Sequence, residues 1–475
     1  MNNVINAEGE RPVQLSEVAI QGRDHFFAPR VQDKTWKSVR TYTLPISTAL
    51  STRPNVIKVT IPRAPHGFFW NLSTLKWDMK TKLIDKTGQK APDDAAIAPI
   101  NNVATSMIGN MEIFIGGTSV TKFEYNSYPI QAYLNILLNY SYMERYAGNL
   151  ALSGYEKDVI KTEESVIISS NQGMKKRRAH FGSDVKEGNK EVFKFSDKPA
   201  PYMSKLLNYF TACSTPLPYG LEGEITLTIK DPSYYLQMDD TQKDKGFHLD
   251  LSHLKFQMEQ RELNQPTLKN FEQRLAKQNV LMRGRRLGVV KEVITKGSST
   301  LHKYNLTSGT TCPQRIAIVF IEEEWETLPG KTPLKFATKF PGKEGKSAIL
   351  NRVDIIHQGA PLEDTADDDP VTFIARMYEL YQRTSGYNDG RNSGCIPLED
   401  FSVNSFIAFF DCKKRKRASD SADIYQEKID PPLDLHVDFT TQVDTNVVMY
   451  AFLEYFTDLE ITKNNDVSLW AFGKA

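Results

Sequence analysis

The sequence predicts an all-β fold made of two tandem β-sandwiches. Three observations lead to this prediction: a length of 475 residues, an aromatic content of 11%, and a long series of short alternating strand patterns separated by turn residues. A chain of this length exceeds one ordinary hydrophobic core and fits two domains of roughly 200 residues each. Aromatic residues favour strands, and many short strands between turns are typical of sandwiches and barrels.

Strands account for most of the first half. Residues 56–61 alternate and are β-branched, and residues 68–84 alternate apolar with polar side chains for the length of a full sandwich strand. Residues 110–120 are expected to form a strand pair, because Gly116 and Gly117 supply the positive φ of a tight turn. The remaining strands of this half are expected at 222–229 and 248–258.

One helix is predicted inside each half and one between the halves. Residues 128–140 carry apolar side chains at helical spacing, and Pro129 suits the first turn. Residues 370–382 again open with a proline, and residues 266–280 are expected to form a connecting helix. Residues 141–200 are polar and rich in turn residues, so they are expected to form a long excursion from the first sandwich.

The second half repeats the order of the first. Its strands are expected at 315–321, 352–359, 433–440 and 446–462. Matching positions lie 242 residues apart at the strand and its glycine turn, and 241 apart at the proline that opens the helix. The matched residues are Glu112 with Asp354, Ile113 with Ile355, Gly117 with Gly359, and Pro129 with Pro370. This ordered set indicates an internal duplication.

The duplication sets the predicted domain limits. They are an N-terminal arm (1–35), a first sandwich (36–263), a connecting helix and linker (264–284), a second sandwich (285–462) and a C-terminal tail (463–475). The arm is polar, but Phe26, Phe27 and the adjoining Trp36 are costly to leave in water. We therefore expect the arm to become partly ordered in an assembly.

Charge and cysteine content argue against several classes of protein. The chain has 59 Lys and Arg against 58 Asp and Glu, whereas a protein that coats nucleic acid usually has a basic excess. The four cysteines, Cys213, Cys312, Cys395 and Cys412, form no CxxC pair, which argues against a structural zinc site and a disulfide framework. Neither a secretory signal nor an apolar segment of membrane-spanning length is recognised.

The usual motifs of enzymes are also missing from the sequence. Residues 329–332 and 345–347 lack the upstream glycine of a phosphate loop. The eight histidines contain no HxH or HExxH pattern, and His248 and His253 are expected on opposite faces of one strand. We therefore predict no catalytic, cofactor-binding or metal-binding residues.

Four charged clusters remain. Asp364 and Asp367–Asp369 are expected to form a solvated loop that helps to start the next helix, with a divalent cation site as the alternative. Two basic clusters, at 175–178 and 283–286, are expected in exposed loops. The longest basic run is Lys413, Lys414, Arg415, Lys416 and Arg417. It is either an exposed loop or a functional element, namely a nuclear import signal or an electrostatic contact with genome or acidic neighbours.

Several segments match one known group of proteins in the order of their strands and helices. They are 102–158 with the strand MEIFIGG, 216–231, 283–290, 352–359, the helix with Tyr378 and Tyr381, and 433–461. These segments resemble the double jelly-roll major capsid proteins of Polinton/Maverick elements and adintoviruses. The resemblance spans most of residues 40–462 and rests on element order with a few anchoring residues, not on a short exact motif.

The resemblance implies two eight-stranded jelly-roll β-sandwiches, each with a short inserted helix, in a structural protein. It implies a homotrimer, because three copies present six sandwiches and a pseudo-hexameric outline that tiles an icosahedral viral shell. Neighbouring capsomers, penton proteins and minor capsid proteins are the expected partners, and no cofactor or sequence-specific nucleic acid is expected. The expected location is the virion capsid after synthesis in the host cytoplasm, with nuclear import left open.

Two other functions stay open at this point. A hydrolase built on two jelly rolls requires a cleft in which two or three carboxylates converge. A carbohydrate-binding pair of modules requires aromatic side chains exposed on one face of a sandwich.

Overall fold

The computed structural model describes residues 3–5, 12–14, 35–93, 95–121, 126–140, 150–156, 171–188, 190–206, 216–238, 240–307, 312–327, 334–363, 365, 367, 369–385, 396–412 and 432–471. Of the predicted N-terminal arm, the structure therefore describes little more than two short antiparallel strands, β1 (Asn3–Ile5) and β2 (Pro12–Gln14).

Two four-stranded antiparallel sheets form the first sandwich. Their strands are β3 (Trp36–Leu44), β4 (Val56–Ile61), β5 (Phe68–Thr81), β8 (Ile108–Ile115), β9 (Thr118–Ser119), β12 (Ala200–Lys205), β13 (Gly223–Ile229) and β16 (Leu254–Leu263). One sheet has the order β3-β16-β5-β12, and the other has the order β4-β13-β8-β9. Short pairs extend this half: β6 (Leu83–Ile84) with β15 (His248–Leu249), β7 (Ile97–Pro99) with β14 (Leu236–Met238), and β10 (Gly182–Glu187) with β11 (Lys190–Phe195).

The second sandwich repeats this sheet order. Its strands are β17 (Val280–Ile294), β18 (Thr300–Lys303), β19 (Arg315–Glu322), β20 (Lys339–Pro341), β21 (Ser347–His357), β22 (Ala360–Pro361), β23 (Ala408–Asp411), β24 (Asp434–Phe439), β25 (Val447–Ile461) and β26 (Val467–Ala471). The order β17-β25-β19-β23 corresponds to β3-β16-β5-β12, and β18-β24-β21 corresponds to β4-β13-β8. Strand β26 pairs with β25, and β22 pairs with β21 as β9 pairs with β8.

The predicted duplication is visible in the pairing of individual residues. Ile113 on β8 lies opposite Ile225 on β13, and Ile355 on β21 lies opposite Leu435 on β24. All four side chains are buried. Positions 242 residues apart in sequence therefore occupy equivalent places in the two sheets.

The turns that follow these strands are equivalent as well. Gly116 and Gly117 have φ angles of 56° and 79°, and their counterparts Gln358 and Gly359 have φ angles of 53° and 78°. Two successive positive φ angles characterise the type I′ turn, which matches the twist of a two-residue hairpin. The glycine pair therefore predicted the hairpin correctly in the first half.

Helices occupy the connections between strands. They are α2 (Val103–Ser106), α3 (Tyr128–Asn139), α5 (Gln172–Ala179), α6 (Pro232–Tyr235), α7 (Gln265–Leu275), α8 (Glu323–Thr327), α9 (Pro370–Ser385) and α10 (Leu398–Val403), with short 3₁₀ turns at Ala151–Ser153, Asp240–Lys245 and Lys343–Gly345. The predicted helices correspond to α3, α7 and α9. Helix α7 starts where the Asn264 side chain accepts a hydrogen bond from the Thr267 amide (2.8 Å).

One predicted strand is wrong. Residues 248–258 do not form a single strand, because β15 pairs with β6 whereas β16 pairs with β5. Between them, the Asp250 side chain accepts a hydrogen bond from the Ser252 amide (3.0 Å), which turns the chain from one partner to the other. His248 and His253 therefore do not share a strand.

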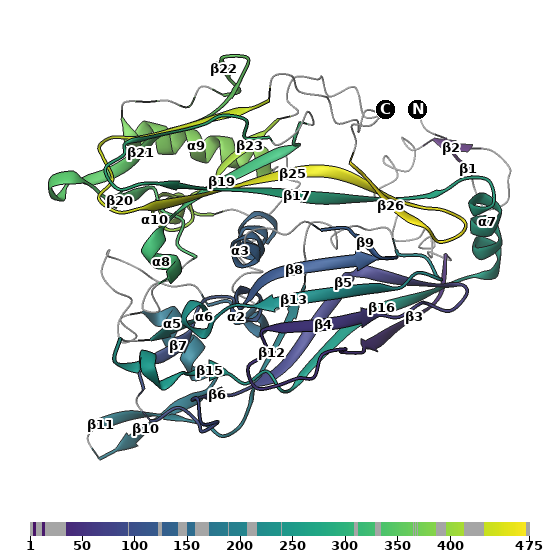
Figure 1. The fold of residues 1–475 in the computed structure, drawn as a ribbon, viewed down its shortest axis with the longest axis horizontal. Coiled ribbons are helices and arrows are strands. Elements are labelled where there is room, and N and C mark those ends of the chain that lie inside the picture. Colours follow the sequence, from purple (N-terminus) through teal and green to yellow (C-terminus); the bar gives the residue numbers. More distant parts are fainter. Residues whose placement is uncertain are drawn as a thin grey trace.

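Helix α3 belongs to the first half of the chain but packs into the core of the second sandwich (Figure 1). The Tyr133 ring meets the Phe336 ring edge to face, with centroids 5.5 Å apart. The Tyr381 hydroxyl of α9 donates a hydrogen bond to the Leu137 carbonyl (3.5 Å). The inserted helices of the two sandwiches thus contact each other.

The second half contacts the first in return. Met282 on β17 and Leu459 and Ile461 on β25 are buried in the core of the first sandwich. The Thr118 hydroxyl of β9 donates a hydrogen bond to the Val467 carbonyl of β26 (2.9 Å). Figure 1 shows β17 and β25 running the length of the molecule above the first sandwich. Strand β17 starts inside the predicted linker, and β26 lies inside the predicted tail. The limits of the two domains themselves stay a prediction.

Candidate functional site

The basic cluster at 175–178 lies on helix α5, so the prediction of an exposed loop is wrong. Arg177 is fully buried. Its guanidinium donates hydrogen bonds to the carbonyls of Pro99 (2.7 Å) and Glu156 and to the side chain of Gln237 (3.1 Å). Arg178 lies 4.0 Å from the centre of the Phe193 ring. These two arginines attach α5 to the first sandwich and have a structural role.

The second basic cluster, at 283–286, is part of strand β17 and also does not form a loop. Arg285 makes an ion pair with the mostly buried Glu454 of the neighbouring strand (2.9 Å). The longest basic run, 413–417, lies outside the described residues, and so do residues 329–332 of the first phosphate-loop candidate. The role expected for 413–417 therefore stays a prediction.

The acidic loop starts helix α9, as expected. The Asp369 carboxylate accepts hydrogen bonds from the Thr372 hydroxyl (2.8 Å) and from the Val371 amide (3.3 Å). These bonds lower the pKa of Asp369 below its ordinary value. Asp367 makes an ion pair with Arg376, which lies nearly two turns into the helix (3.1 Å). No group of three potential metal ligands is found in the part of the chain that the structure describes.

Two histidines that are far apart in the sequence lie against each other. His302 on β18 and His436 on β24 are directly opposite in the register, and their ring centroids are 3.7 Å apart. The Asp438 carboxylate lies 3.0 Å from Nε2 of His436. Burial lowers the pKa of His436, and Asp438 opposes this effect. Only the sheet register brings these rings together, so local sequence carries no signal for the pair.

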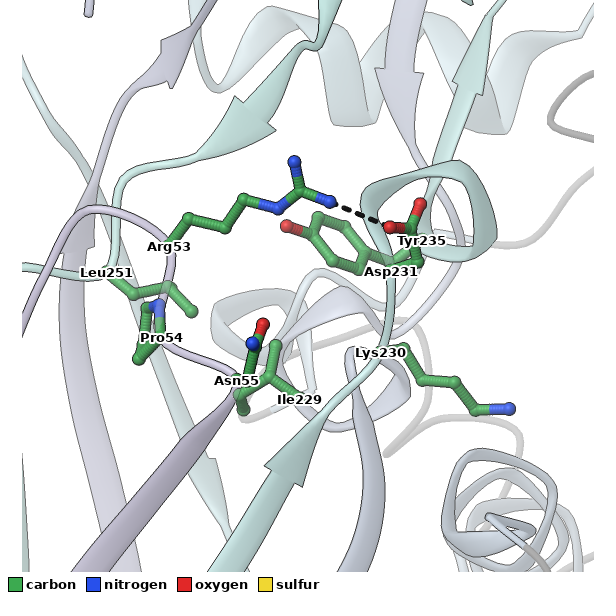
Figure 2. A pocket seen from close by; sticks show the side chains of 8 residues that line it. All are labelled: Arg53, Pro54, Asn55, Ile229, Lys230, Asp231, Tyr235 and Leu251. Atoms are coloured by element: carbon green, nitrogen blue, oxygen red, sulfur yellow. Dashed lines mark hydrogen bonds and ion pairs between the residues drawn. The ribbon is translucent and has the colours of Figure 1, made fainter. Parts of the chain in front are cut away.

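A small pocket lies at one end of the first sandwich (Figure 2). It has a volume of about 160 Å³ and is lined by Arg53, Pro54, Asn55, Ile229, Lys230, Asp231, Tyr235 and Leu251. Its carboxylate, Asp231, makes an ion pair with Arg53 (2.7 Å), which Figure 2 shows above the Tyr235 ring. A hydrolase needs a second converging carboxylate, so this pocket does not support that alternative.

Lys230 points away from the pocket (Figure 2), and the charged groups that act on it, Glu326 and Lys291, belong to the second half of the chain. Its ammonium lies 4.1 Å from the centre of the Tyr234 ring. The carboxylate of Glu326 attracts this ammonium, and the ammonium of Lys291 repels it. The Glu326 carboxylate also accepts hydrogen bonds from Tyr450 (2.6 Å) and Lys291 (3.2 Å). We refer to Lys230, Tyr234, Lys291, Glu326 and Tyr450 as the interdomain ionic cluster. It joins the two halves and was not predicted, because its residues come from distant segments.

This cluster gives the protein a pH-dependent stability. Burial and, to a smaller extent, Lys291 lower the pKa of Lys230 to about 8, although Glu326 opposes them. Below pH 8 the lysine is charged in both states, so its burial cost is fully present. Above pH 8 the folded state loses the proton first, whereas the unfolded chain keeps it up to its ordinary pKa of 10.5. The contribution of Lys230 to stability therefore rises with pH in this window.

We expect the contribution of Lys230 to the free energy of unfolding to increase by about 2 kcal/mol between pH 7.5 and 9.5. Urea denaturation at intervals across this range measures the change. A Lys230→Met variant should show no such increase, whereas Lys255→Met, at an exposed position on β16, should behave as the parent chain. Parallel curves for Lys230→Met and the parent would contradict the assignment.

None of the helices in the described residues has the length and apolar character needed to cross a membrane.

Comparisons with known proteins identify the fold. No protein-family model matches the sequence, and no curated protein matches it. Among solved structures, a chain of the Sputnik virophage matches with a TM-score of 0.60 and 10% identity, over 94% of this chain and 91% of that one. The mavirus major capsid protein matches with a TM-score of 0.50 and 11% identity, over 95% of each chain. The Faustovirus major capsid protein matches with a TM-score of 0.50 and 10% identity, over 93% and 96%.

At these identities the likeness is one of fold. The chain has the double jelly-roll fold of these viral major capsid proteins, which confirms the predicted fold class.

Proposed function

We propose that this chain is the major capsid protein of an icosahedral virus and acts as a structural subunit, not as an enzyme. In this proposal it belongs with the capsid proteins of Polinton/Maverick elements and adintoviruses, forms homotrimers with a pseudo-hexameric outline, and resides in the virion. Penton and minor capsid proteins complete the shell. The fold shared with solved capsid proteins over more than nine-tenths of the chain supports this function.

The equivalence of the two sandwiches carries the proposal. Within one chain, the β8–β9 hairpin of the first sandwich contacts the second sandwich through Thr118 and Val467. The counterpart of Thr118 is Ala360, which is exposed together with Pro361 on the β21–β22 hairpin. The second sandwich thus exposes the surface that the first one uses for its contact. In a closed ring, the next copy covers that surface, and three copies provide six sandwiches.

The first test is the mass of the purified chain. We expect light scattering to give three times the 53.9 kDa mass of one chain, and negative-stain images to show hexagonal particles. Obligate interfaces of this kind bury about 2,000 Å² or more, so the trimer should persist at micromolar concentration. A chain that stays monomeric at every concentration, without hexagonal particles, would refute the proposal.

A pair of variants tests the surface. Ala360→Arg should shift the mass toward the monomer at concentrations where the parent chain is a trimer, because a charged side chain would replace a small one in the contact. Val185→Arg serves as the matched control. Val185 is 38% exposed on the β10–β11 hairpin, which has no counterpart among the described strands of the second sandwich. Equal masses for both variants would place the contact elsewhere.

A further inference from the structure

Two cysteines that are 100 positions apart in sequence lie next to each other in the second sandwich. Cys312 precedes strand β19 and Cys412 directly follows β23, and these two strands pair antiparallel. The pairing continues to the second cysteine, because the Cys412 amide donates a hydrogen bond to the Gln314 carbonyl (3.0 Å). The backbone therefore holds the two residues at the same end of one strand pair.

Their side chains meet at the edge of the hydrophobic core. Both cysteines are partly buried and pack against the core of the second sandwich, as does Tyr455 on β25. The two thiols lie close enough to interact directly, and this interaction favours the protonated form of Cys412. Cys312 also donates a hydrogen bond from its sulfur to the Pro313 carbonyl (3.2 Å). Two thiols that interact at the same end of one strand pair are placed to be joined by a disulfide.

We propose that Cys312 and Cys412 are a site of oxidative modification that closes to an intramolecular disulfide by exchange with a low-molecular-weight disulfide such as glutathione disulfide. The Cys312 thiolate attacks one sulfur of the small disulfide and releases one small thiol. Cys412 then attacks the Cys312 sulfur and releases the second small thiol. Two protein thiols are oxidised, one small disulfide is reduced, and the two thiol protons go to the two released thiols.

The order of the two steps follows from the surroundings of the thiols. The interaction with Cys312, together with burial, raises the pKa of the Cys412 thiol well above its ordinary value. A thiol must ionise before it can attack. Cys412 is therefore the thiol that reacts second, after the mixed disulfide at Cys312 has made it part of an intramolecular step.

The disulfide would fasten a short outer strand. Strand β23 has four residues and stands at the end of the sheet order β17-β25-β19-β23, where β19 is its neighbour. The bond closes a long loop, and the stabilisation by a cross-link increases with the length of the loop that it closes. The pair would stay reduced inside a cell and close in an oxidising medium. This inference is independent of the proposed function, because it depends only on the fold of one chain.

The experiment uses the full chain in a Cys213→Ser, Cys395→Ser background, so that only the two cysteines of interest remain. The chain is incubated in glutathione buffers of increasing disulfide content, alkylated, and analysed by peptide mass mapping. We expect one peptide pair linked between Cys312 and Cys412, with the loss of two hydrogen atoms and of both alkylation sites. Thermal unfolding of the oxidised chain should occur about 5 °C higher than that of the reduced chain.

The matched control also carries Cys312→Ser and Cys412→Ser and should show the same unfolding temperature in every buffer. If both cysteines stay fully alkylated in the most oxidising buffer, the proposal is wrong. It is equally wrong if the only cross-linked peptides join two chains, or if each cysteine stops at the mixed disulfide with glutathione.

Discussion

Replacement of Arg177 by methionine is expected to lower the free energy of unfolding by about 3–5 kcal/mol. The side chain is fully buried, and its donors reach the carbonyls of Pro99 and Glu156 and the side chain of Gln237. Methionine fills much of the same volume but leaves these acceptors without a donor in a place that water does not reach. A buried polar group without its partner costs the full price of its desolvation.

The same helix provides the control. Lys175 is exposed on α5, so Lys175→Met makes the same kind of change without removing a buried contact and should alter stability by less than about 0.5 kcal/mol. Urea denaturation followed by tryptophan fluorescence compares the two variants with the parent chain. Hydrogen exchange of the α5 amides adds a local readout if Arg177→Met loosens only this helix. Equal stability of the two variants would contradict the structural role of Arg177.

Arg177 also shows where prediction from sequence fails. Four basic residues in a row are typical of a solvated loop, and nothing in the sequence of residues 175–178 indicates that Arg177 is the buried one. Its burial depends on acceptors that lie 78, 21 and 60 positions away. The same reason applies to the interdomain ionic cluster and to the cysteine pair, whose members come together only when the sheets form.

The features that could be predicted are local or repeated. Strand β4 coincides with residues 56–61, because alternation and β-branching are properties of the segment itself. The turn after β8 was predicted because two glycines allow positive φ angles without a steric cost. The duplication was predicted from matched positions such as Ile113 and Ile355, which have to fill equivalent places in two copies of one fold.

The second large effect is expected at the contact between the two halves of the chain. Gly116 has a φ of 56°, and a Cβ atom at this position would lie 2.6 Å from a methyl carbon of Val467 on β26. We expect Gly116→Ala to destabilise the protein by about 3 kcal/mol, as the sum of left-handed backbone strain and overpacking. The neighbouring Gly117 has a φ of 79° and nothing within 4 Å of its Cβ position. Gly117→Ala should therefore show the strain alone, about 1–2 kcal/mol.

A double-mutant cycle with Val467→Ala separates these two causes. Removing the Val467 methyl groups makes room for the new Cβ, so we expect Gly116→Ala and Val467→Ala to be coupled by about 1 kcal/mol or more, measured by urea denaturation. Gly117→Ala should show no coupling to Val467→Ala, because its Cβ would not reach β26. A coupling energy near zero at both glycines would mean that β26 does not pack on the first hairpin in solution. Coupling confined to Gly116 would establish that β26 packs on the first hairpin and joins the second sandwich to the first.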